Sequence, residues 1–202
     1  KYYSFSGQYL ASPSLLKLPS GALLASMDVF AGLAPQNLTI IFRSDDGGNS
    51  WRYVTNLFPS FWGKLFLHNG ALYMLAVSNE YGDLLIGRSD DEGYTWTTPI
   101  VIMRGSSNSR ENGHHRAPVV ILKSHGRLWT ASEFGSWHKK QFKNCLISID
   151  ENDDLLKAEN WTCTGFLSHD ETWPGAIPGC VGGIEGNAVE TPDGEILNIL
   201  RY

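Results

Sequence analysis

Four short segments of the chain share one pattern, in which an apolar run, a turn containing glycine and a second apolar run follow one another. They span residues 14–25, 65–75, 119–130 and 188–200. Their turns are Ser20-Gly21, Asn69-Gly70, His125-Gly126 and Asp193-Gly194. Because such turns need positive φ, the pattern predicts four β-hairpins. The hairpins lie far apart along the chain, so each is expected to be one part of a larger unit.

A second motif follows two of these hairpins. Apolar residues 38–42 and 84–86 lead into SDDGGNSW at 44–51 and SDDEGYTW at 89–96, which share the form S-x-D-x-G-x-[S/T]-W. The form predicts a turn in which aspartate accepts backbone N–H groups, glycine adopts the left-handed conformation and tryptophan packs on the sheet. These residues are Asp46, Gly48 and Trp51 in the first turn, and Asp91, Gly93 and Trp96 in the second.

The third unit is a degenerate form of the same arrangement. Residues 146–149 lead to an insert at 153–159, expected to form a short helix, and then to Trp161. Fourth strands are predicted at 52–55, 98–102 and 162–166, and a buried innermost strand at 117–122. Units of four antiparallel strands at this spacing are typical of β-propeller blades.

The predicted fold is therefore all-β, a β-propeller of four-stranded antiparallel blades. The blades are placed at about 10–60, 61–105 and 114–168, with a half-blade at 183–202, or about three and a half blades. A half-blade leaves an unpaired sheet edge, so we expect a fragment of a larger propeller. A β-sandwich with two chance turn matches is the alternative.

Composition narrows the possible functions. The 202 residues are 42% hydrophobic and 18% charged with a net charge of -5, which is typical of a soluble globular chain. This charge gives no basic surface for a nucleic acid and no polybasic patch for a membrane. The longest apolar run, residues 117–122, is too short to span a bilayer. The chain begins with Lys1 and no visible signal peptide, so a processed or excised start is expected.

The three cysteines give little further information. Their odd number and the absence of C-x-x-C spacing argue against a structural zinc site, and no metal or other cofactor is predicted. Cys145 and Cys163 form a disulfide if they face each other on neighbouring strands. Two buried free thiols are the equally weighted alternative.

The two S-x-D-x-G-x-[S/T]-W turns resemble the Asp-boxes of the sialidase superfamily and its BNR-repeat relatives. Residues 12–26, 113–129 and 182–201 also resemble bacterial sialidase-like, glycan-degrading members of that superfamily. The resemblance implies a propeller of six or seven blades when complete, a secreted or periplasmic location, and partner blades after residue 202. One feature departs from the family: the arginine of its Arg-Ile-Pro motif is missing at Ala11-Ser12-Pro13. Strict sialidase activity is therefore disfavoured.

In such propellers the substrate lies at the channel mouth, over loops that precede the innermost strands and loops that join the second and third strands. His114, His115 and Glu185 are the candidate catalytic residues there, because imidazole and carboxylate groups transfer protons near neutral pH. Arg116 is expected to bind a substrate carboxylate through two hydrogen bonds. A structural histidine and a carboxylate that caps backbone amides are the alternatives. Further substrate-binding candidates are Trp62, Tyr81, Glu133, Trp137, His138, Arg201 and Tyr202.

These residue types predict a carbohydrate-active enzyme whose partner is an acidic oligo- or polysaccharide containing sialic or uronic acid. A sialidase-like exo-glycosidase needs two carboxyl groups, which Glu133, Glu185, Asp28 or Glu80 supply. A polysaccharide lyase, which cleaves a uronate-containing glycan by β-elimination, would instead use the paired histidines with Arg116 and a tyrosine. A non-catalytic glycan-binding propeller is the third hypothesis.

Overall fold

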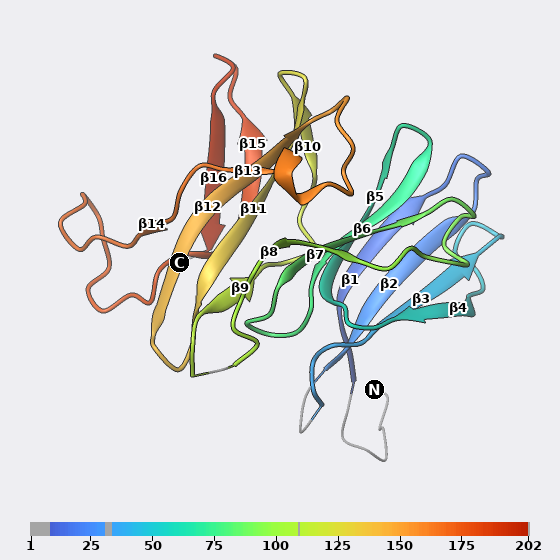
Figure 1. Cartoon of the computed structure of the whole chain (residues 1–202), viewed down its shortest axis with the longest axis horizontal. Coiled ribbons are helices and arrows are strands. Elements are labelled where there is room, and N and C mark those ends of the chain that lie inside the picture. The colour runs from blue at the N-terminus through green and yellow to red at the C-terminus, as the bar shows by residue number, and fades with distance from the viewer. Residues whose placement is uncertain (1–8, 31–33, 109, 202) are drawn as a thin grey trace.

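The computed structural model describes residues 9–30, 34–108 and 110–201, which form a nearly all-β structure of four antiparallel sheets (Figure 1). Each of the first two sheets has four strands in chain order. The first consists of β1 (Tyr9–Lys17), β2 (Leu23–Phe30), β3 (Thr39–Ser44) and β4 (Arg52–Leu57). The second consists of β5 (Phe61–His68), β6 (Ala71–Val77), β7 (Leu84–Ser89) and β8 (Ile100–Met103).

The third sheet is more irregular, and the fourth is a hairpin. In the third, β9 and β10 both pair with β11, while β13 and β14 both pair with β12. Its strands are β9 (Gly113–His115), β10 (Leu122–Ser124), β11 (Arg127–Ser136), β12 (Gln141–Asp150), β13 (Thr162–Cys163) and β14 (Leu167–Ser168). The hairpin is formed by β15 (Ile184–Glu190) and β16 (Ile196–Arg201). These sheets confirm the predicted blades of four antiparallel strands.

The predicted hairpins form at their glycine turns. Asn69 and Gly70 have φ of 46° and 79°, and His125 and Gly126 have φ of 53° and 69°. Two successive residues with positive φ match the right-handed twist of the flanking strands. The local turn chemistry therefore fixes these connections.

Two local predictions about the third unit are wrong. Residues 117–121 are not a strand; they form an irregular segment between β9 and β10. Pro118 has no N–H to donate to a sheet ladder, and Val119 bonds back to the carbonyl of Ala117. The insert forms no helix over 153–159; its one helical turn is the 3-10 element η1 (Ala158–Asn160). All three cysteines are free thiols; Cys145 is buried and Cys163 is exposed.

The two S-x-D-x-G-x-[S/T]-W turns have matching geometry. In the second, the Asp91 carboxylate accepts bonds from the Thr95 N–H (2.8 Å) and hydroxyl (2.6 Å), and Ser89 Oγ accepts the Gly93 N–H (2.9 Å). Trp96 Nε1 donates to the Gly93 carbonyl at 3.0 Å. The first turn repeats these bonds at Ser44, Asp46, Gly48, Ser50 and Trp51. The predicted turn chemistry is confirmed, although Trp51 remains 41% exposed.

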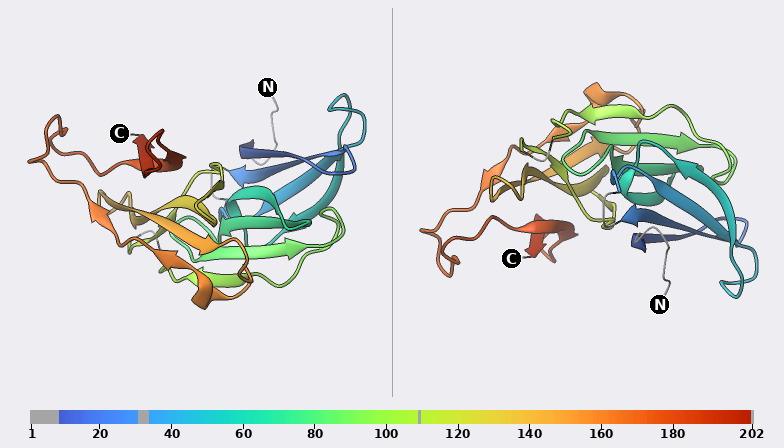
Figure 2. Two further views of the ribbon diagram at one scale, coloured as in Figure 1. Left: turned by 90° about the horizontal axis from the view of Figure 1, so that it is seen from above. Right: turned by 90° about the horizontal axis from the view of Figure 1, so that it is seen from below.

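The hydrophobic core lies between successive sheets, which follow one another as separate blades (Figure 2). Leu24 and Ile41 of the first sheet pack with Leu65 and Met74 of the second. The opposite face of the second sheet packs in the same way on the third sheet, and the third sheet packs on the β15–β16 hairpin. Because each interface is apolar on both sides, the blades are held at fixed positions relative to one another.

Candidate active site

Three innermost strands are interrupted at corresponding positions. The pairing of β1, β5 and β15 with the next strand shifts between residues 11 and 14, 61 and 64, and 184 and 187. Inside these bulges Ser12, Trp62 and Glu185 have φ of 50°, 49° and 55°. A β-bulge redirects a side chain away from the regular pleat, and positive φ is uncommon for residues other than glycine. The bulges therefore place three side chains at the same end of their blades.

In the third sheet, the end of β9 occupies the corresponding position. Gly113, His114 and His115 pair with β11, and the chain then leaves the sheet at Arg116. Gly113 is required here because a Cβ atom would collide with the backbone of Tyr81. The close approach of the Tyr81 loop thus explains why glycine precedes the two histidines.

Two buried carboxylates each accept a hydrogen bond from the bulge of the next blade. Asp28, opposite Ala11, accepts a hydrogen bond from the Trp62 N–H at 2.8 Å. Glu133, opposite His115, accepts one from the Gly186 N–H at 2.9 Å. Both carboxylates hold the backbone of a bulge, so they fix the directions of the Trp62 and Glu185 side chains.

Asp28 is enclosed by its hydrogen-bond partners. The Thr39 hydroxyl donates to Oδ1 at 2.6 Å, and the residue is 1% exposed. Burial raises the pKa of Asp28 to about 7, and the bonds from Thr39, Trp62 and Ser12 only partly oppose this effect. Near neutral pH the carboxyl is therefore protonated in a substantial part of the molecules.

His115, Glu133 and Arg116 form a buried polar cluster. His115 Nδ1 lies 3.3 Å from Glu133 Oε2, and both side chains are almost fully enclosed. The guanidinium of Arg116 donates to the Leu75 carbonyl at 3.1 Å. Burial lowers the pKa of Arg116 to about 10, and the negative charge of Glu133 acts in the opposite direction. Arg116 is only 1% exposed, so it stabilises the blade rather than presenting an open guanidinium.

His114 faces a different environment from that of its neighbour. Its Nδ1 lies 3.1 Å from the Ser132 hydroxyl, and its ring packs edge-on against Phe134. The side chain is fully buried, and burial lowers the pKa of His114 to about 4. At neutral pH this imidazole is uncharged and away from solvent.

Glu185 is the most accessible carboxylate of this group. Its side chain is 40% exposed, and its Oε2 lies 2.9 Å from Nε of Arg201. A second bond joins Arg201 to Oε1 at 3.1 Å. The two-point ion pair holds the carboxylate in one orientation while leaving it open to solvent.

An aromatic row connects the same positions. The Trp62 ring centroid lies 4.3 Å from that of His115, which lies 5.3 Å from that of Phe142. Phe142 in turn packs against Trp137, which is 44% exposed. Tyr81 packs on Phe142 and Ile184, and burial followed by the charge of Glu80 raises the pKa of Tyr81 to about 12. This end of the blades, which we call the rim, therefore has a hydrophobic floor on which Trp137 is exposed and Trp62 is partly buried.

The structure thus brings most of the predicted residues into one neighbourhood, joined directly or through Phe142 and Gly186, with Arg116 acting on Glu133 through its charge. They are Trp62, Tyr81, His115, Arg116, Glu133, Trp137, Glu185 and Arg201. His138 is exposed in the turn between β11 and β12, while His114 points into the blade. Tyr202 lies outside the described residues.

Two residues of the site were not selected from the sequence. Phe142, which joins His115 to Trp137, resembles any other core phenylalanine in the sequence. Lys64 follows the Trp62 bulge, and burial together with the positive charge of Arg116 lowers its pKa. From the sequence, Asp28 is only one of four candidate carboxylates. Its alternation with Leu24 and Ser26 on an apolar strand indicates that the side chain is buried with a hydrogen-bond partner.

Among residues 9–30, 34–108 and 110–201, no three His, Cys, Asp or Glu side chains lie close enough to hold a metal ion. Nor does any helix of these segments have the length and apolarity needed to cross a membrane.

The fold resembles several solved glycosidase structures. An α-L-arabinanase from Penicillium chrysogenum, solved with arabinobiose, matches with a TM-score of 0.62 and 15% identity over 96% of this chain and 57% of its own. An α-L-arabinofuranosidase from Lactobacillus brevis matches with a TM-score of 0.66 and 13% identity, over 96% of this chain and 66% of its own. A β-1,3-galactosidase matches with a TM-score of 0.63 and 14% identity, over 96% and 67%. No protein-family model and no curated protein matches the sequence.

These likenesses confirm the β-propeller fold and correct the expected family. The matching propellers are arabinanases, arabinofuranosidases and galactosidases, so the assignment to the sialidase superfamily is wrong. The S-x-D-x-G-x-[S/T]-W turn misled because it is a local hydrogen-bonding solution that different propeller families can share. The chain spans little more than half the length of the Penicillium arabinanase.

Proposed function

We propose that the chain is part of a glycoside hydrolase that cleaves a neutral oligosaccharide at the rim described above. The observation that carries the proposal is the accessible Glu185 carboxylate, held by Arg201 and preceding Gly186, whose N–H donates to Glu133. Glu133 in turn contacts His115 of the aromatic row. Glycosidases place carboxyl groups beside the scissile bond, and sugar rings stack on aromatic faces. The solved propellers of similar fold include enzymes bound to arabinobiose.

Each group at the rim has a distinct role in this proposal. Glu185 touches the substrate as nucleophile or general base, while Trp62 and Trp137 carry the sugar rings. Glu133 and Asp28 are positioning residues, because they hold the backbone at Gly186 and Trp62. Hydrolysis requires a second carboxyl group, and we place it in the part of the propeller that this chain does not include.

The charges of the rim favour a neutral substrate over the acidic glycan expected from the sequence. Arg116 is enclosed and bonded to protein oxygens, and Arg201 is already paired with Glu185. A substrate carboxylate would have to displace Glu185 to reach Arg201. We further propose that the protein acts outside the cytoplasm, as a secreted or periplasmic enzyme, which fractionation of the source cells tests.

The test uses the full-length protein and a panel of neutral arabino- and galacto-oligosaccharides. Glu185→Gln should lower turnover at least about 100-fold, because proton transfer and nucleophilic groups contribute this much or more. The control is Glu195→Gln, an exposed change on the same hairpin. Turnover retained in Glu185→Gln at the level of the control would remove this residue from catalysis. Sugar binding without cleavage by the wild type would favour a binding module.

A further inference from the structure

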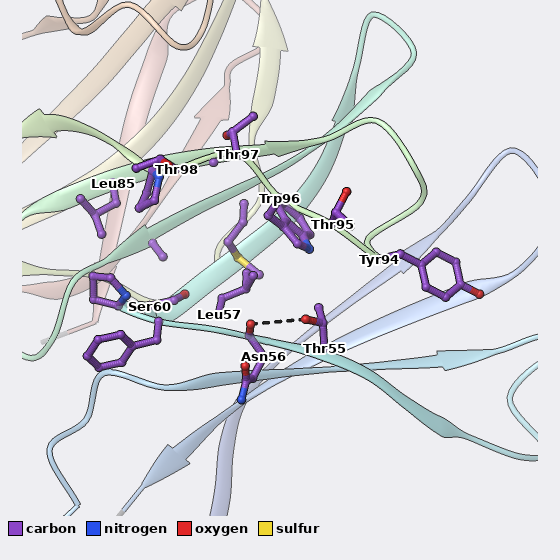
Figure 3. A pocket seen from close by; sticks show the side chains of 16 residues that line it. Thr55, Asn56, Leu57, Ser60, Leu85, Tyr94, Thr95, Trp96, Thr97 and Thr98 are labelled. Atoms are coloured by element: carbon purple, nitrogen blue, oxygen red, sulfur yellow. Dashed lines mark hydrogen bonds between the residues drawn. The ribbon is translucent and has the colours of Figure 1, made fainter.

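A hollow lies at the outer side of the first two blades, and none of the side chains placed at the rim lines it. Residues 55–60, from the end of β4 onward, form one wall and residues 94–99, after the second turn motif, form the other (Figure 3). Met74, Ala76, Leu85 and Gly87 form its floor. Its volume of about 540 Å³ lies within the range of small-ligand sites. We call this hollow the inter-blade groove.

The side chains of the groove suit an uncharged polyhydroxyl ligand. None of the described residues that line it carries a charge. Phe58 is 69% exposed at its edge and the partly buried Trp96 ring lies inside it, whereas the Tyr94 ring points away toward Arg43 and Arg52 (Figure 3). Thr55 and Thr98 lie on opposite walls, and their hydroxyls supply hydrogen-bonding groups (Figure 3). Rings for the apolar faces of sugars and neutral polar groups for their hydroxyls favour a neutral oligosaccharide over a charged ligand or an apolar peptide.

The corresponding junction between the second and third blades is filled by the chain itself. There the insert before Trp161 places Leu155 in the core and Leu156 against it, and η1 contacts β8. Leu155 is only 1% exposed. The second turn motif lacks such an insert, and the chain runs directly from Trp96 to β8. The inter-blade groove is open because nothing in the first two blades replaces Leu155 and its neighbours.

Several groups of the groove are fixed before a ligand arrives. Trp96 Nε1 donates to the Gly93 carbonyl at 3.0 Å, which fixes the ring on the floor side. The loop that carries Trp96 is held as well, because the Tyr94 hydroxyl accepts a bond from Arg52 at 2.6 Å and the Arg43 and Arg52 guanidiniums lie 5.7 and 5.6 Å from the centre of the Tyr94 ring. Side chains that are already ordered lose little entropy on binding.

We propose that the inter-blade groove is a second binding site, which holds a neutral oligosaccharide separately from the rim. The proposal goes beyond the proposed hydrolysis, because the groove needs no catalytic group. Phe58 and Trp96 supply the stacking faces, and Thr55 and Thr98 supply the polar contacts.

The test is electrophoresis of the full-length protein through native gels that contain arabinan, galactan or xylan. Phe58→Ala should weaken the retardation by at least fivefold in apparent affinity. The control is Tyr53→Ala, because Tyr53 is an exposed β4 tyrosine outside the groove. Thr98→Trp, which adds bulk inside the groove without removing a ring, should weaken binding as well. Thermal unfolding of each variant shows that the fold is kept.

Unchanged retardation of both groove variants would overturn the proposal, and so would a wild type that none of the three polysaccharides retards. In the latter case the groove serves another kind of ligand. Cleavage of short oligosaccharides is assayed separately, so loss of the groove hypothesis and loss of the proposed hydrolysis give different results.

Discussion

The Oε1 atom of Glu133 accepts a hydrogen bond from the backbone N–H of Gly186 at 2.9 Å, although the two residues lie in different blades. The Asp28–Trp62 bond has the same form at the junction of the first two blades. In both pairs a buried carboxylate on a second strand holds a bulge on the innermost strand of a later blade. This contact determines where the side chains of the rim point.

Glu133 also balances buried positive charge. In Glu133→Gln the amide oxygen can still accept the Gly186 N–H, but the buried Arg116 loses a compensating charge. We expect the free energy of unfolding to fall by about 3 kcal/mol, because an uncompensated buried charge is costly. Urea unfolding measures this loss. In the double variant with Arg116→Met the losses should be less than additive; additive losses would show that the two side chains do not interact.

The titration of Asp28 predicts a pH dependence of stability. Burial raises its pKa to about 7 from 3.8, so between these values the folded chain binds a proton that the unfolded chain has released. The resulting stabilisation is complete below pH 3.8 and is lost as the pH rises through about 7. Its full size corresponds to about 4 kcal/mol.

Asp28→Asn should remove this dependence. The free energy of unfolding of the variant minus that of the wild type should therefore be larger at pH 8 than at pH 5. Urea unfolding at both pH values tests the expectation. Asp193→Asn, an exposed change in a hairpin turn, is the control. A difference between Asp28→Asn and wild type that is the same at both pH values would contradict it.

The titration of His114 predicts a pH dependence of stability with the opposite sign. Burial lowers its pKa to about 4 from 6.5, so its neutral form stabilises the fold above pH 6.5, and this contribution disappears as the pH falls through about 4. The full effect corresponds to about 3 kcal/mol. As the pH falls from 6.5 to 4.5, the free energy of unfolding of His114→Gln should rise relative to that of the wild type. A gap that stays constant over this range would show that His114 does not titrate as described.

The second turn motif should contribute measurably to stability. Ser89 is 2% exposed, and its Oγ accepts the Gly93 N–H at 2.9 Å. Ser89→Ala leaves this buried donor without its partner, which we expect to cost about 1–3 kcal/mol. Ser50→Ala, which removes an exposed hydroxyl from the first motif, should cost less because water replaces it. Equal losses in thermal or urea unfolding would contradict the role assigned to Ser89.

Local features of the fold were readable from the sequence, whereas contacts between blades were not. The turns at Gly70 and Gly126 and the bonds of Asp91 depend on residues within a few positions of one another. The bulges at Trp62 and Glu185 depend instead on carboxylates that the fold brings from earlier blades. The failed strand at 117–121 was detectable, because Pro118 cannot join a sheet ladder as a donor.

The candidate site shows the same division. The sequence predicts the paired histidines and Glu185 at one channel mouth, and in the structure Glu133 links the two segments through His115 and Gly186. Burial could not be read from residue type, so Arg116 and His114 were expected to face substrate although the structure encloses both. Arginine and histidine are usually exposed or partly exposed, and only the packing of neighbouring blades reveals the exception.

The central claim is that the rim hydrolyses a glycosidic bond, and the most direct measurement is the mass of the products. The full-length protein is incubated with neutral arabino- and galacto-oligosaccharides and, in parallel, with uronate-containing glycans, and the products are analysed by mass spectrometry. Hydrolysis predicts a pair of products from a neutral substrate whose masses add up to the substrate plus one water. A pair that adds up to the substrate alone, with an unsaturated uronate as one member, would contradict the account and identify a lyase.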